Sequence, residues 1–320
     1  MTAPAPAAPG APRLSYVIPS YNRALVLPSA VASVLEQLGA DDEVVIVDDG
    51  SRDETPAVLR QLEARWGARL RVLEQANAGP GAARNAGIAA ARGDWIGFLD
   101  SDDLLLPGAV ALARAAIRRH PEAGFLCGGR IERLPDGQER VLRGRAVPAD
   151  PIGAMHGFLV THRRSLGVGA VLARRDVALK CGFPPELVFA EDNVFFARAL
   201  AVTRTATIPE PLYRYNLEPD RVQSRAHWRD FSVERMVDLM FDPAIVPPAA
   251  QRIKDAALAA AWLSVFRDLH RLGRDGEARG YFHRAFRRHP FLALRWRYLR
   301  KYLRGLVGLR HRESRRVSRA

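Results

Sequence analysis

The chain has 320 residues, of which 48% are hydrophobic and 26% are charged, so it can bury a substantial core and is not of the disordered class. Its two cysteines, Cys127 and Cys181, exclude a disulfide scaffold and a cysteine metal site, and they suit a reducing cytoplasm. No apolar run approaches the roughly 18 residues of a membrane span. Residues 1–12 are rich in Ala and Pro, and we expect a flexible lead there and not a signal peptide.

The formal net charge of +13 lies almost entirely at one end of the chain. Residues 281–320 contain thirteen Lys or Arg and a single acid, Glu313, so they carry +12 and the preceding residues are nearly neutral. A nucleic-acid-binding protein is expected to spread basic and aromatic residues over a face or groove. The charge therefore indicates a basic tail on a neutral body, and we expect no nucleic-acid partner.

The first hundred residues alternate between strand and helix patterns. Short apolar runs predict buried strands at residues 14–18, 43–47, 70–73 and 95–99. Helical spacing of apolar residues predicts helices at residues 25–38 and 53–66, and residues 77–87 open a third helix. This alternation predicts right-handed crossovers and a mostly parallel central sheet flanked by helices, an α/β fold.

The second half of the chain changes from mixed patterns to helices alone. Up to residue 227 we expect helices at residues 107–120 and 174–181, and a further helix at residues 191–200 that begins with the acidic pair Glu191-Asp192. We expect strands at residues 165–173 and 209–215, and a hairpin of residues 124–134 and 139–147 around Pro135-Asp136-Gly137. Beyond it we expect helices at residues 231–241, 248–272, 275–289 and 291–307. The division predicts an α/β domain at residues 13–227 and a C-terminal helical region with a basic tail at residues 228–320.

Polar clusters follow the predicted strands. Ser20-Tyr21-Asn22 follows the first strand, Asp48-Asp49-Gly50-Ser51 the second, and Asp100-Ser101-Asp102-Asp103 the fourth. Open α/β sheets bind their ligands at the carboxyl ends of the strands. We therefore expect one shared site at this edge of the sheet.

Three carboxylates within four residues are the main chemical signal of the sequence. Asp100, Asp102 and Asp103 repel one another, and a divalent cation such as Mg²⁺ is the usual reason to keep such a group together. In an extended segment Asp100 and Asp102 face the same side. The alternative is an ordinary polar turn in which Asp103 caps the next helix.

The glycine-rich stretch between the third strand and its helix does not fit two common nucleotide motifs. Gly79-x-Gly81 lacks the third glycine of a dinucleotide fingerprint, since Arg84 stands there, and it does not follow the first strand. No P-loop lysine pattern occurs. The sequence therefore argues against a Rossmann dehydrogenase and a P-loop enzyme.

Taken together and in this order, four motifs resemble those of family 2 glycosyltransferases of the GT-A fold. They are Val17-Ile18-Pro19-Ser20-Tyr21-Asn22, Val47-Asp48-Asp49-Gly50-Ser51, Asn77-x-Gly79 with Ala83-Arg84-Asn85-x-Gly87, and Phe98-Leu99-Asp100-Ser101-Asp102-Asp103. The resemblance covers about residues 13–215. It implies sugar transfer from a nucleotide diphosphate sugar to a hydroxyl acceptor, with Mg²⁺ or Mn²⁺ and inversion at the anomeric carbon, in the assembly of cell-surface polysaccharide or glycolipid.

The same resemblance assigns residues to the donor nucleotide. Pro19 and Tyr21 would wall the nucleotide pocket, and Asp49 would accept hydrogen bonds from the base or ribose. Arg84 would offer a planar fork to phosphate or base oxygens. Ordinary roles remain open for three of them: packing for Tyr21, a turn before glycine for Asp49, and a solvated helix arginine for Arg84.

The Asp cluster and one further acidic pair would carry the chemistry. Asp100, Ser101 and Asp102 would bind the donor, and Asp102, Asp100 or Asp103 would hold the cation, which neutralises the leaving diphosphate. The family has Glu-Asp at a helix start after a Gly-Phe segment, and this assigns the general base to Asp192 with Glu191 orienting the acceptor or the base. The alternative for the pair is an N-terminal acidic turn favoured by the helix dipole.

Two further parts of the chain are left open by the motifs. Residues 216–227 form a polar segment that could fold over the diphosphate. Arg221, Arg225 and His227 within it, and Arg214 just before it, are individual candidates or solvated charges. The last helix and the Arg-rich end, with Trp296, Tyr298 and Tyr302, predict peripheral contact of a cytoplasmic enzyme with an anionic inner membrane face, where lipid-linked acceptors are found. The alternative is that its apolar arc packs on the catalytic domain.

Other classes of protein remain as competing interpretations. A nucleotidyltransferase also binds a nucleotide and a metal on an α/β sheet, but it is expected to carry a Gly-rich signature after the first strand, and Glu191-Asp192 has no role in it. A basic-tailed protein that binds nucleic acid or membranes without catalysis is the alternative from another class.

Overall fold

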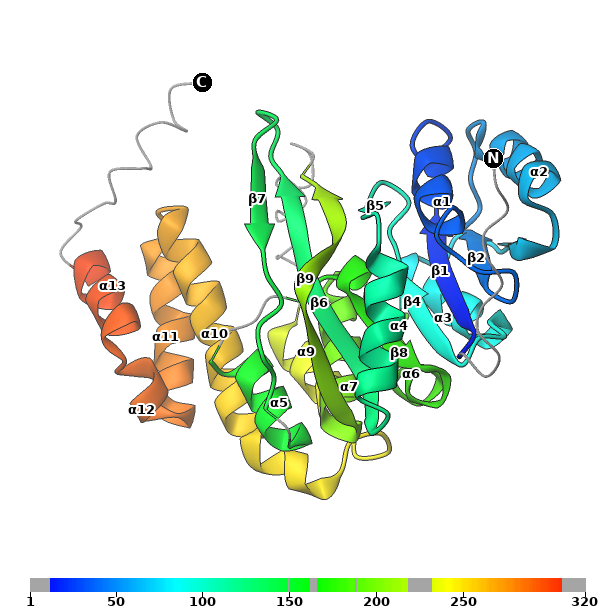
Figure 1. The fold of residues 1–320 in the computed structure, drawn as a ribbon. Coiled ribbons are helices and arrows are strands. Elements are labelled where there is room, and N and C mark those ends of the chain that lie inside the picture. The colour runs from blue at the N-terminus through cyan, green and yellow to red at the C-terminus, as the bar shows by residue number, and fades with distance from the viewer. Residues whose placement is uncertain (1–11, 149, 162–165, 188, 218–231, 307–320) are drawn as a thin grey trace.

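The computed structural model describes residues 12–148, 150–161, 166–187, 189–217 and 232–306, and Figure 1 shows their arrangement. A single nine-stranded sheet runs through the middle, in the order β3-β2-β1-β4-β8-β6-β9-β5, with β7 paired to β6. The strands are β1 (Leu14–Ser20), β2 (Glu43–Asp48), β3 (Leu70–Glu74), β4 (Trp95–Phe98), β5 (Leu104–Leu105), β6 (Ala123–Arg133), β7 (Glu139–Leu142), β8 (Val171–Arg174) and β9 (Arg204–Asn216).

The sheet has a parallel half and a mixed half. Strands β3, β2, β1 and β4 are parallel neighbours, which confirms the four strands predicted from the first hundred residues. Beyond β4 the order is mixed: β8 is antiparallel to both β4 and β6, β9 is parallel to β6, and β5 is antiparallel to β9. The hairpin predicted around residues 135–137 is the antiparallel pair β6–β7.

Alternating residues of the strands face two different helical layers. Tyr16 and Ile18 of β1 belong to a core closed by α1 (Leu27–Leu35), α2 (Thr55–Trp66) and α4 (Ala109–Arg119). Val17, between them, faces the core of α3 (Pro80–Ala90), α5 (Pro151–Leu159), α6 (Arg175–Cys181) and α7 (Glu191–Val202). The strict alternation in a sheet with both faces covered explains why these strands read as continuous apolar runs.

The C-terminal helices continue the second of these cores. They are α9 (Val233–Met240), α10 (Lys254–Arg271), α11 (Asp275–Arg288), α12 (Pro290–Ala293) and α13 (Trp296–Leu306). One connected cluster of buried side chains extends from Val17 and Phe98 in the sheet through Phe241 and Phe266 to Tyr298 in α13. Within the described ranges, no helix is both long enough and apolar enough to cross a membrane.

Two predicted elements differ from the structure. The last helix is broken, because α12 ends at Ala293 and α13 starts at Trp296. The strand predicted at residues 165–173 is β8 alone, and a 3₁₀ turn precedes it. Gly167 and Gly169 pack tightly on Tyr213, where a Cβ at Gly167 would meet the hydroxyl group and a Cβ at Gly169 would lie 2.5 Å from the ring.

Helix α5 was not predicted, although the Asp150 side chain caps its start by accepting a hydrogen bond from the Gly153 N–H. Residues 1–11, the proposed domain boundary at 227/228 and the Arg-rich end after residue 306 lie outside the described residues.

Candidate active site

Strands β1, β2 and β4 end at one edge of the sheet, and the polar residues after them lie there together. Asp49, directly after β2, is buried and donates its backbone N–H to the Ser20 carbonyl at 2.8 Å. Its carboxylate accepts hydrogen bonds from the N–H groups of Ala78 and Gly79, each at 2.8 Å, and from Gln75 Nε2 at 2.7 Å. These bonds use about three of the roughly four acceptor sites of the carboxylate. Asp49 therefore fixes the loop before α3 and keeps little capacity for a ligand.

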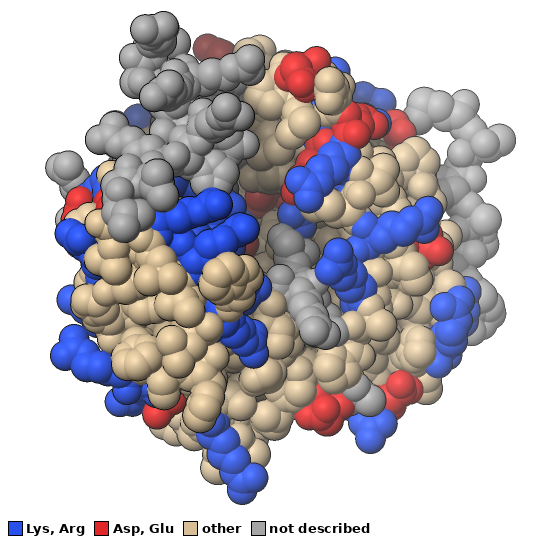
Figure 2. Space-filling view, turned by 90° about the vertical axis from the view of Figure 1, so that its left-hand side faces the viewer, with Lys and Arg blue, Asp and Glu red and all other residues tan. Residues whose placement is uncertain are grey.

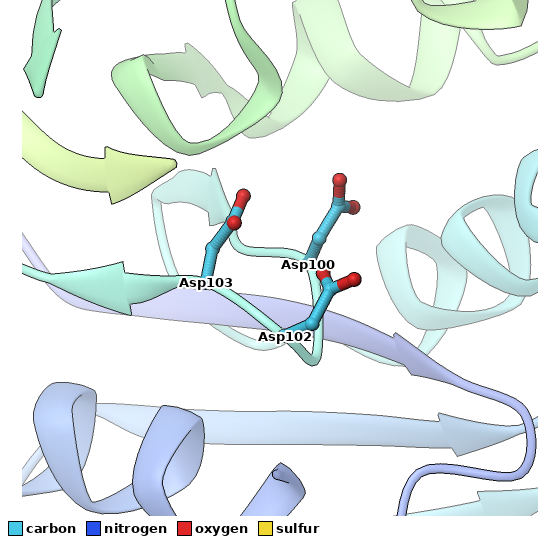
Figure 3. Close-up of side chains that lie close together, drawn as sticks. All are labelled: Asp100, Asp102 and Asp103. Carbon is cyan, nitrogen blue, oxygen red and sulfur yellow. The ribbon is translucent and has the colours of Figure 1, made fainter. Parts of the chain in front are cut away.

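Three carboxylates converge in the turn after β4, as Figure 3 shows. Asp100, Asp102 and Asp103 each offer an oxygen within 4.8 Å of the oxygens of the other two. The turn is closed by the Asp103 N–H, which donates to the Asp100 carbonyl at 3.0 Å. The segment is therefore not extended, and a turn brings Asp100 and Asp102 to one side and adds Asp103. Carboxylate oxygens at this spacing form a donor set that suits Mg²⁺ or Mn²⁺.

Asp103 also holds the end of β9. The Asn216 N–H donates to Asp103 Oδ1 at 3.1 Å, and Asn216 Nδ2 donates to the Asp102 carbonyl at 2.7 Å. Burial, and next the charge of Asp103, raise the pKa of Tyr213 on the same strand well above its ordinary value. Asp103 caps no helix, because β5 follows it and α4 begins only at Ala109. Its place is thus at the junction of the acidic turn with β9.

Arg84 joins the acidic turn to the acidic pair at the start of α7. Its guanidinium donates to Asp100 Oδ1 at 2.8 Å and to Glu191 Oε1 at 2.7 Å, and it lies 5.2 Å above the Phe183 ring. Burial acts to lower the pKa of Arg84, but the two carboxylates raise it above its ordinary value, so the side chain is a permanent cation. Its two donor edges are occupied by protein carboxylates.

Helix α3 holds Arg84 in this position through two close contacts. Asn85 binds the backbone of Phe183 in both directions, accepting from its N–H at 2.8 Å and donating to its carbonyl at 2.7 Å. Gly87 lies against β1, where a Cβ would stand 2.3 Å from Val17 Cγ1. The Arg-Asn-x-Gly motif therefore packs α3 against both the sheet and the segment Gly182-Phe183.

The acidic pair begins α7, where the helix dipole favours negative charge. Asp192 is partly buried and accepts a hydrogen bond from the Asn193 N–H at 2.7 Å. Burial of the carboxyl group, and next the Glu191 carboxylate, raise the pKa of Asp192 to about 7. The preceding residue, Ala190, has φ 63°, a left-handed conformation that costs free energy for a residue with a Cβ. Strain beside a perturbed carboxyl group is typical of a functional site.

The remaining predicted residues surround this centre. Pro19 and Ser101 are buried, whereas the Tyr21 side chain is 42% exposed after the end of β1 and is accessible to a ligand. Arg214 forms an ion pair with Glu139 at 3.0 Å. Arg221, Arg225 and His227 lie outside the described residues.

Two residues at the site were not predicted. Arg23 approaches Asp102 Oδ2 at 3.8 Å, and Asn216 binds the Asp turn. Arg23 has no sequence signal, and Asn216 begins the polar segment 216–227 without being singled out there, because both contacts are created by the fold. Asn85 and Phe183 were part of the recognised motifs, and their mutual hydrogen bonds give those motifs a physical role.

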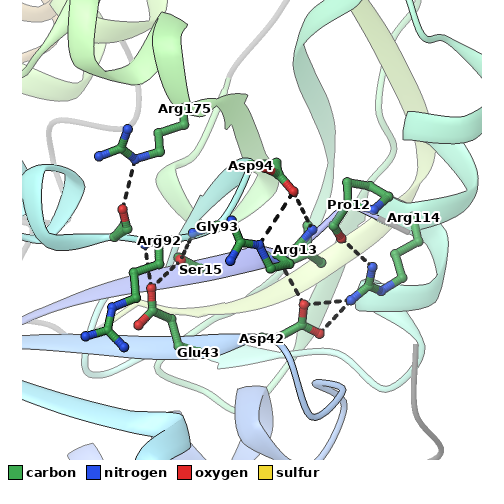
Figure 4. Close-up of polar contacts among 12 residues, drawn as sticks. Pro12, Arg13, Ser15, Asp42, Glu43, Arg92, Gly93, Asp94, Arg114 and Arg175 are labelled. Carbon is green, nitrogen blue, oxygen red and sulfur yellow. Dashed lines mark hydrogen bonds and ion pairs between the residues drawn. The ribbon is translucent and has the colours of Figure 1, made fainter. Parts of the chain in front are cut away.

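A second polar cluster lies at the opposite, amino-terminal edge of the sheet (Figure 4). Asp42 pairs with Arg114 at 2.6 Å, and Glu43 accepts from Ser15 Oγ at 2.8 Å. An open hollow of about 530 Å³ lies here, next to Arg13 and Asp94, which pair with each other at 3.9 Å. Glu43 also pairs with Arg71 of β3 at 3.3 Å, and these contacts tie the starts of the strands together.

Sequence comparison relates part of this chain to known proteins. The sequence model described as "Glycosyl transferase family 2" matches residues 15–172. Succinoglycan biosynthesis protein ExoO of Rhizobium meliloti is 44% identical over 119 residues, which cover 37% of this chain and 33% of that protein. Chondroitin synthase of Escherichia coli is 42% identical over 108 residues, 34% of this chain and 16% of that protein. The chain thus spans about a third or less of the length of these curated relatives.

Solved structures resemble nearly the whole chain. S. aureus TarS in complex with UDP has a TM-score of 0.62 at 19% identity, covering 96% of this chain and 92% of that one. Mannosyltransferase PcManGT from Pyrobaculum calidifontis in complex with GDP-Man and Mn²⁺ has a TM-score of 0.57 at 19% identity, covering 95% and 89%. The fold is of the GT-A class. Over residues 15–172 the chain matches glycosyl transferase family 2.

Proposed function

We propose that this protein is an inverting glycosyltransferase that moves a sugar from a nucleoside diphosphate sugar to a hydroxyl group of a saccharide or lipid-linked acceptor. The observation that carries the proposal is the line of contacts from Asp100 in the acidic turn through Arg84 to Glu191, the residue directly before Asp192. This line joins the proposed metal site to the helix start that carries the proposed base. Relatives named for succinoglycan biosynthesis and chondroitin synthesis support a role in cell-surface polysaccharide or glycolipid assembly.

The acidic turn is the proposed place of the donor diphosphate. Asp100 and Asp102 would hold Mg²⁺ or Mn²⁺, with Asp103 as a third ligand, and the cation when bound would neutralise charge on the leaving nucleoside diphosphate. The complex of the mannosyltransferase neighbour with GDP-Man and Mn²⁺ supports this choice. Tyr21 is the accessible aromatic face for the base, next to Pro19.

In this proposal Arg84 and Asp49 have other roles than the ligand contacts predicted from the sequence. Because the Arg84 guanidinium already binds Asp100 and Glu191, we assign it the orientation of these carboxylates and not direct phosphate binding. Asp49 holds the loop before α3, which forms a wall of the nucleotide site, and can give a ligand at most about one further acceptor site.

The proposed general base, Asp192, acts on the acceptor hydroxyl. Asp192 takes the proton of the acceptor hydroxyl as its oxygen attacks the anomeric carbon, while the bond from that carbon to the diphosphate oxygen breaks and its electrons leave with the diphosphate. A pKa of about 7 suits this step, because a general base works best when its pKa is near the working pH. Attack from the side opposite the diphosphate inverts the configuration.

The place of action is part of the proposal. We assign the enzyme to the cytoplasm, in contact with the inner face of the cell membrane. The support is the charge of +12 in residues 281–320, which favours an anionic surface, and the acceptor class, which includes lipid-linked sugars.

The test is a screen of UDP-, GDP- and TDP-sugars for thermal stabilisation and hydrolysis with Mn²⁺, repeated with EDTA. A donor that stabilises the protein only with metal, and is hydrolysed by the wild type but not by Asp192→Asn, supports the proposal. Asp41→Asn, an exposed carboxylate at the far edge of the sheet, is the matched control and should behave as the wild type. Release of pyrophosphate from a nucleoside triphosphate and a sugar phosphate, without sugar transfer, would instead identify a nucleotidyltransferase.

A further inference from the structure

The helices at the C-terminal end of the described chain expose an unusual amount of apolar surface. Among the described residues, five of the 13 exposed large hydrophobic side chains fall within residues 291–306. They are Phe291 (82% exposed), Leu294 (47%), Trp296 (67%), Leu303 (46%) and Leu306 (49%). Isolated exposed apolar residues are ordinary, but a contiguous group marks an interaction surface.

The rotation of α13 is fixed by its opposite face. Tyr298 is 3% exposed, and the Tyr302 ring stacks on Phe282 of α11 at 4.2 Å, with its hydroxyl 2.7 Å from His283 Nε2. Gly305 lies so close to α11 that a Cβ would be 3.1 Å from Asp275 Oδ1. The two tyrosines therefore belong to the core, which corrects the expectation that they face a membrane together with Trp296.

The outer face of α13 has an apolar stripe and a basic stripe. Trp296, Leu299, Leu303 and Leu306 follow one another at spacings of three and four and so lie on one side of the helix. The sequence between 290 and 306 has five basic and no acidic residues, namely Arg295, Arg297, Arg300, Lys301 and Arg304. Of these, Arg297, Arg300 and Arg304 follow one another at spacings of three and four and form the basic stripe beside the apolar one. Figure 2 faces this side of the molecule and shows Lys and Arg side chains distributed around a broad uncharged area.

Neighbouring helices add to the positive field. Burial, and next the charges of Arg271 and Arg300, lower the pKa of Lys301, which shows how closely the cations are gathered. Residues 307–320 lie outside the described residues, but their sequence contains five arginines and one acid. The chemistry of the surface is therefore cationic around an apolar centre.

We propose that the outer face of α12–α13 is a membrane-binding surface that lies in the interface of an anionic bilayer. Trp296 and its neighbouring leucines enter the boundary between head groups and acyl chains, and the arginines contact anionic head groups. This arrangement is that of an interfacial amphipathic helix, held here in a fixed orientation by a folded domain. The binding itself is independent of the proposed transfer reaction, and only its use to meet a lipid-linked acceptor rests on that function.

Two other occupants fit the surface less well. A symmetric contact with a second copy of the chain would place the same basic stripes against each other, which is electrostatically unfavourable. A nucleic acid would use the arginines but would leave exposed leucines without a partner. An anionic bilayer satisfies both stripes at once.

The test is flotation of the full chain with phosphatidylcholine vesicles that contain either no anionic lipid or about one third phosphatidylglycerol. The wild type should float with the anionic vesicles at low salt, and the pair Trp296→Ser with Leu303→Ser should weaken binding by about tenfold or more. The triple change Arg297→Gln, Arg300→Gln and Arg304→Gln should act similarly and weaken the salt dependence. A control, Leu179→Ser, removes an equally exposed leucine from α6 and should bind as the wild type.

A second measurement reports insertion directly. On anionic vesicles the tryptophan fluorescence of the wild type should shift to shorter wavelength, and Trp296→Phe should remove the shift without loss of thermal stability. Flotation that is equal for the variants and the wild type would overturn the proposal. It would also be overturned if the variants only abolished self-association, seen by sedimentation without lipid, or only abolished RNA binding. Hydrolysis of a soluble donor by each variant separates this outcome from failure of the proposed function.

Discussion

The sheet region, residues 12–217, and the helical region, residues 232–306, differ in the kind of sequence signal that they carry. In the sheet region, motifs predict individual site residues, from Pro19 to Asp192. In the helical region no motif exists, and only apolar spacing was informative. Yet buried side chains run without a break from Val17 in β1 to Tyr298 in α13. The proposed catalytic residues therefore lie in one region of the chain, whereas the buried core that stabilises the fold is shared by both regions.

Helix α7 is the link between the two regions. It begins with Glu191 and Asp192, and its Arg198 donates to the Leu239 carbonyl of α9 at 2.9 Å and to the Cys181 carbonyl of α6 at 2.7 Å. The helical region therefore supports the helix that carries the proposed base. The experiments below separate effects on the catalytic rate from effects on the stability of the fold.

The largest effect is expected from Asp102→Asn. Loss of one carboxylate from the acidic turn should lower turnover by about 10³ or more, because charge neutralisation at a leaving diphosphate is worth several kcal/mol. Thermal unfolding of both regions should be unchanged. Calorimetric titration of UDP, GDP and TDP in Mn²⁺ and in EDTA measures how far nucleotide affinity depends on the metal. Equally strong nucleotide binding in EDTA would refute the metal role.

Asp192→Asn should lower the transfer rate by about 10²–10⁴ and leave donor binding nearly intact, as expected for loss of a general base. In the wild type, kcat/KM should rise about tenfold per pH unit up to the pKa of about 7 and then level off, since only the ionised carboxylate accepts a proton. Full activity of the variant would transfer the role of base to another group, with Glu191 as the next candidate.

The same carboxyl group affects stability with a defined sign. Because its folded pKa is raised above 3.8, its stabilising contribution is complete below about pH 4 and is lost as the pH rises through about 7. Asp192→Asn should therefore gain stability relative to the wild type at pH 8 and not at pH 4. Urea unfolding at the two pH values measures this gain, and a gain of the same size at both would contradict it.

Phe282→Ala tests whether the regions share stability. Phe282 is 4% exposed and stacks on Tyr302, so its removal should cost about 3–5 kcal/mol. The loss should appear as one cooperative transition that includes the sheet region, followed by calorimetry and by near-ultraviolet circular dichroism. A separate early transition of the helices would break the comparison. Phe286→Ala, an exposed phenylalanine on the same helix, is the matched control.

The smallest effect is expected at Ala190. Glycine adopts its φ of 63° without steric cost, so Ala190→Gly should stabilise the fold by about 0.5–1 kcal/mol. The acidic pair should then be less firmly oriented, and turnover should fall severalfold. The melting temperature and kcat together check this, and a loss of stability would show that the strain is absent.

The predictable part of the molecule was the part in which local pattern and fold agree. The strand at residues 43–47 was evident because every residue of β2 is buried. The break between α12 and α13 was not, since Leu294 and Arg295 carry no signal of a helix end. The misjudged strand at residues 165–173 needed knowledge of Tyr213, which comes from another strand.

The site divides in the same way. The acidic turn was recognisable from three neighbouring residues. The engagement of Arg84 by Glu191 joins residues 107 positions apart, and that of Asp103 by Asn216 joins residues 113 apart. Such contacts follow from strand order and helix docking, and no local pattern encodes them.

The single guanidinium between Asp100 and Glu191 has an evolutionary consequence. Any substitution of one carboxylate leaves Arg84 free to bind the other more closely, so the effects of changes at the three positions cannot be additive. A change at Asp100, Arg84 or Glu191 is therefore epistatic with a change at either of the other two positions. Libraries that recode this enzyme should therefore randomise the three codons jointly.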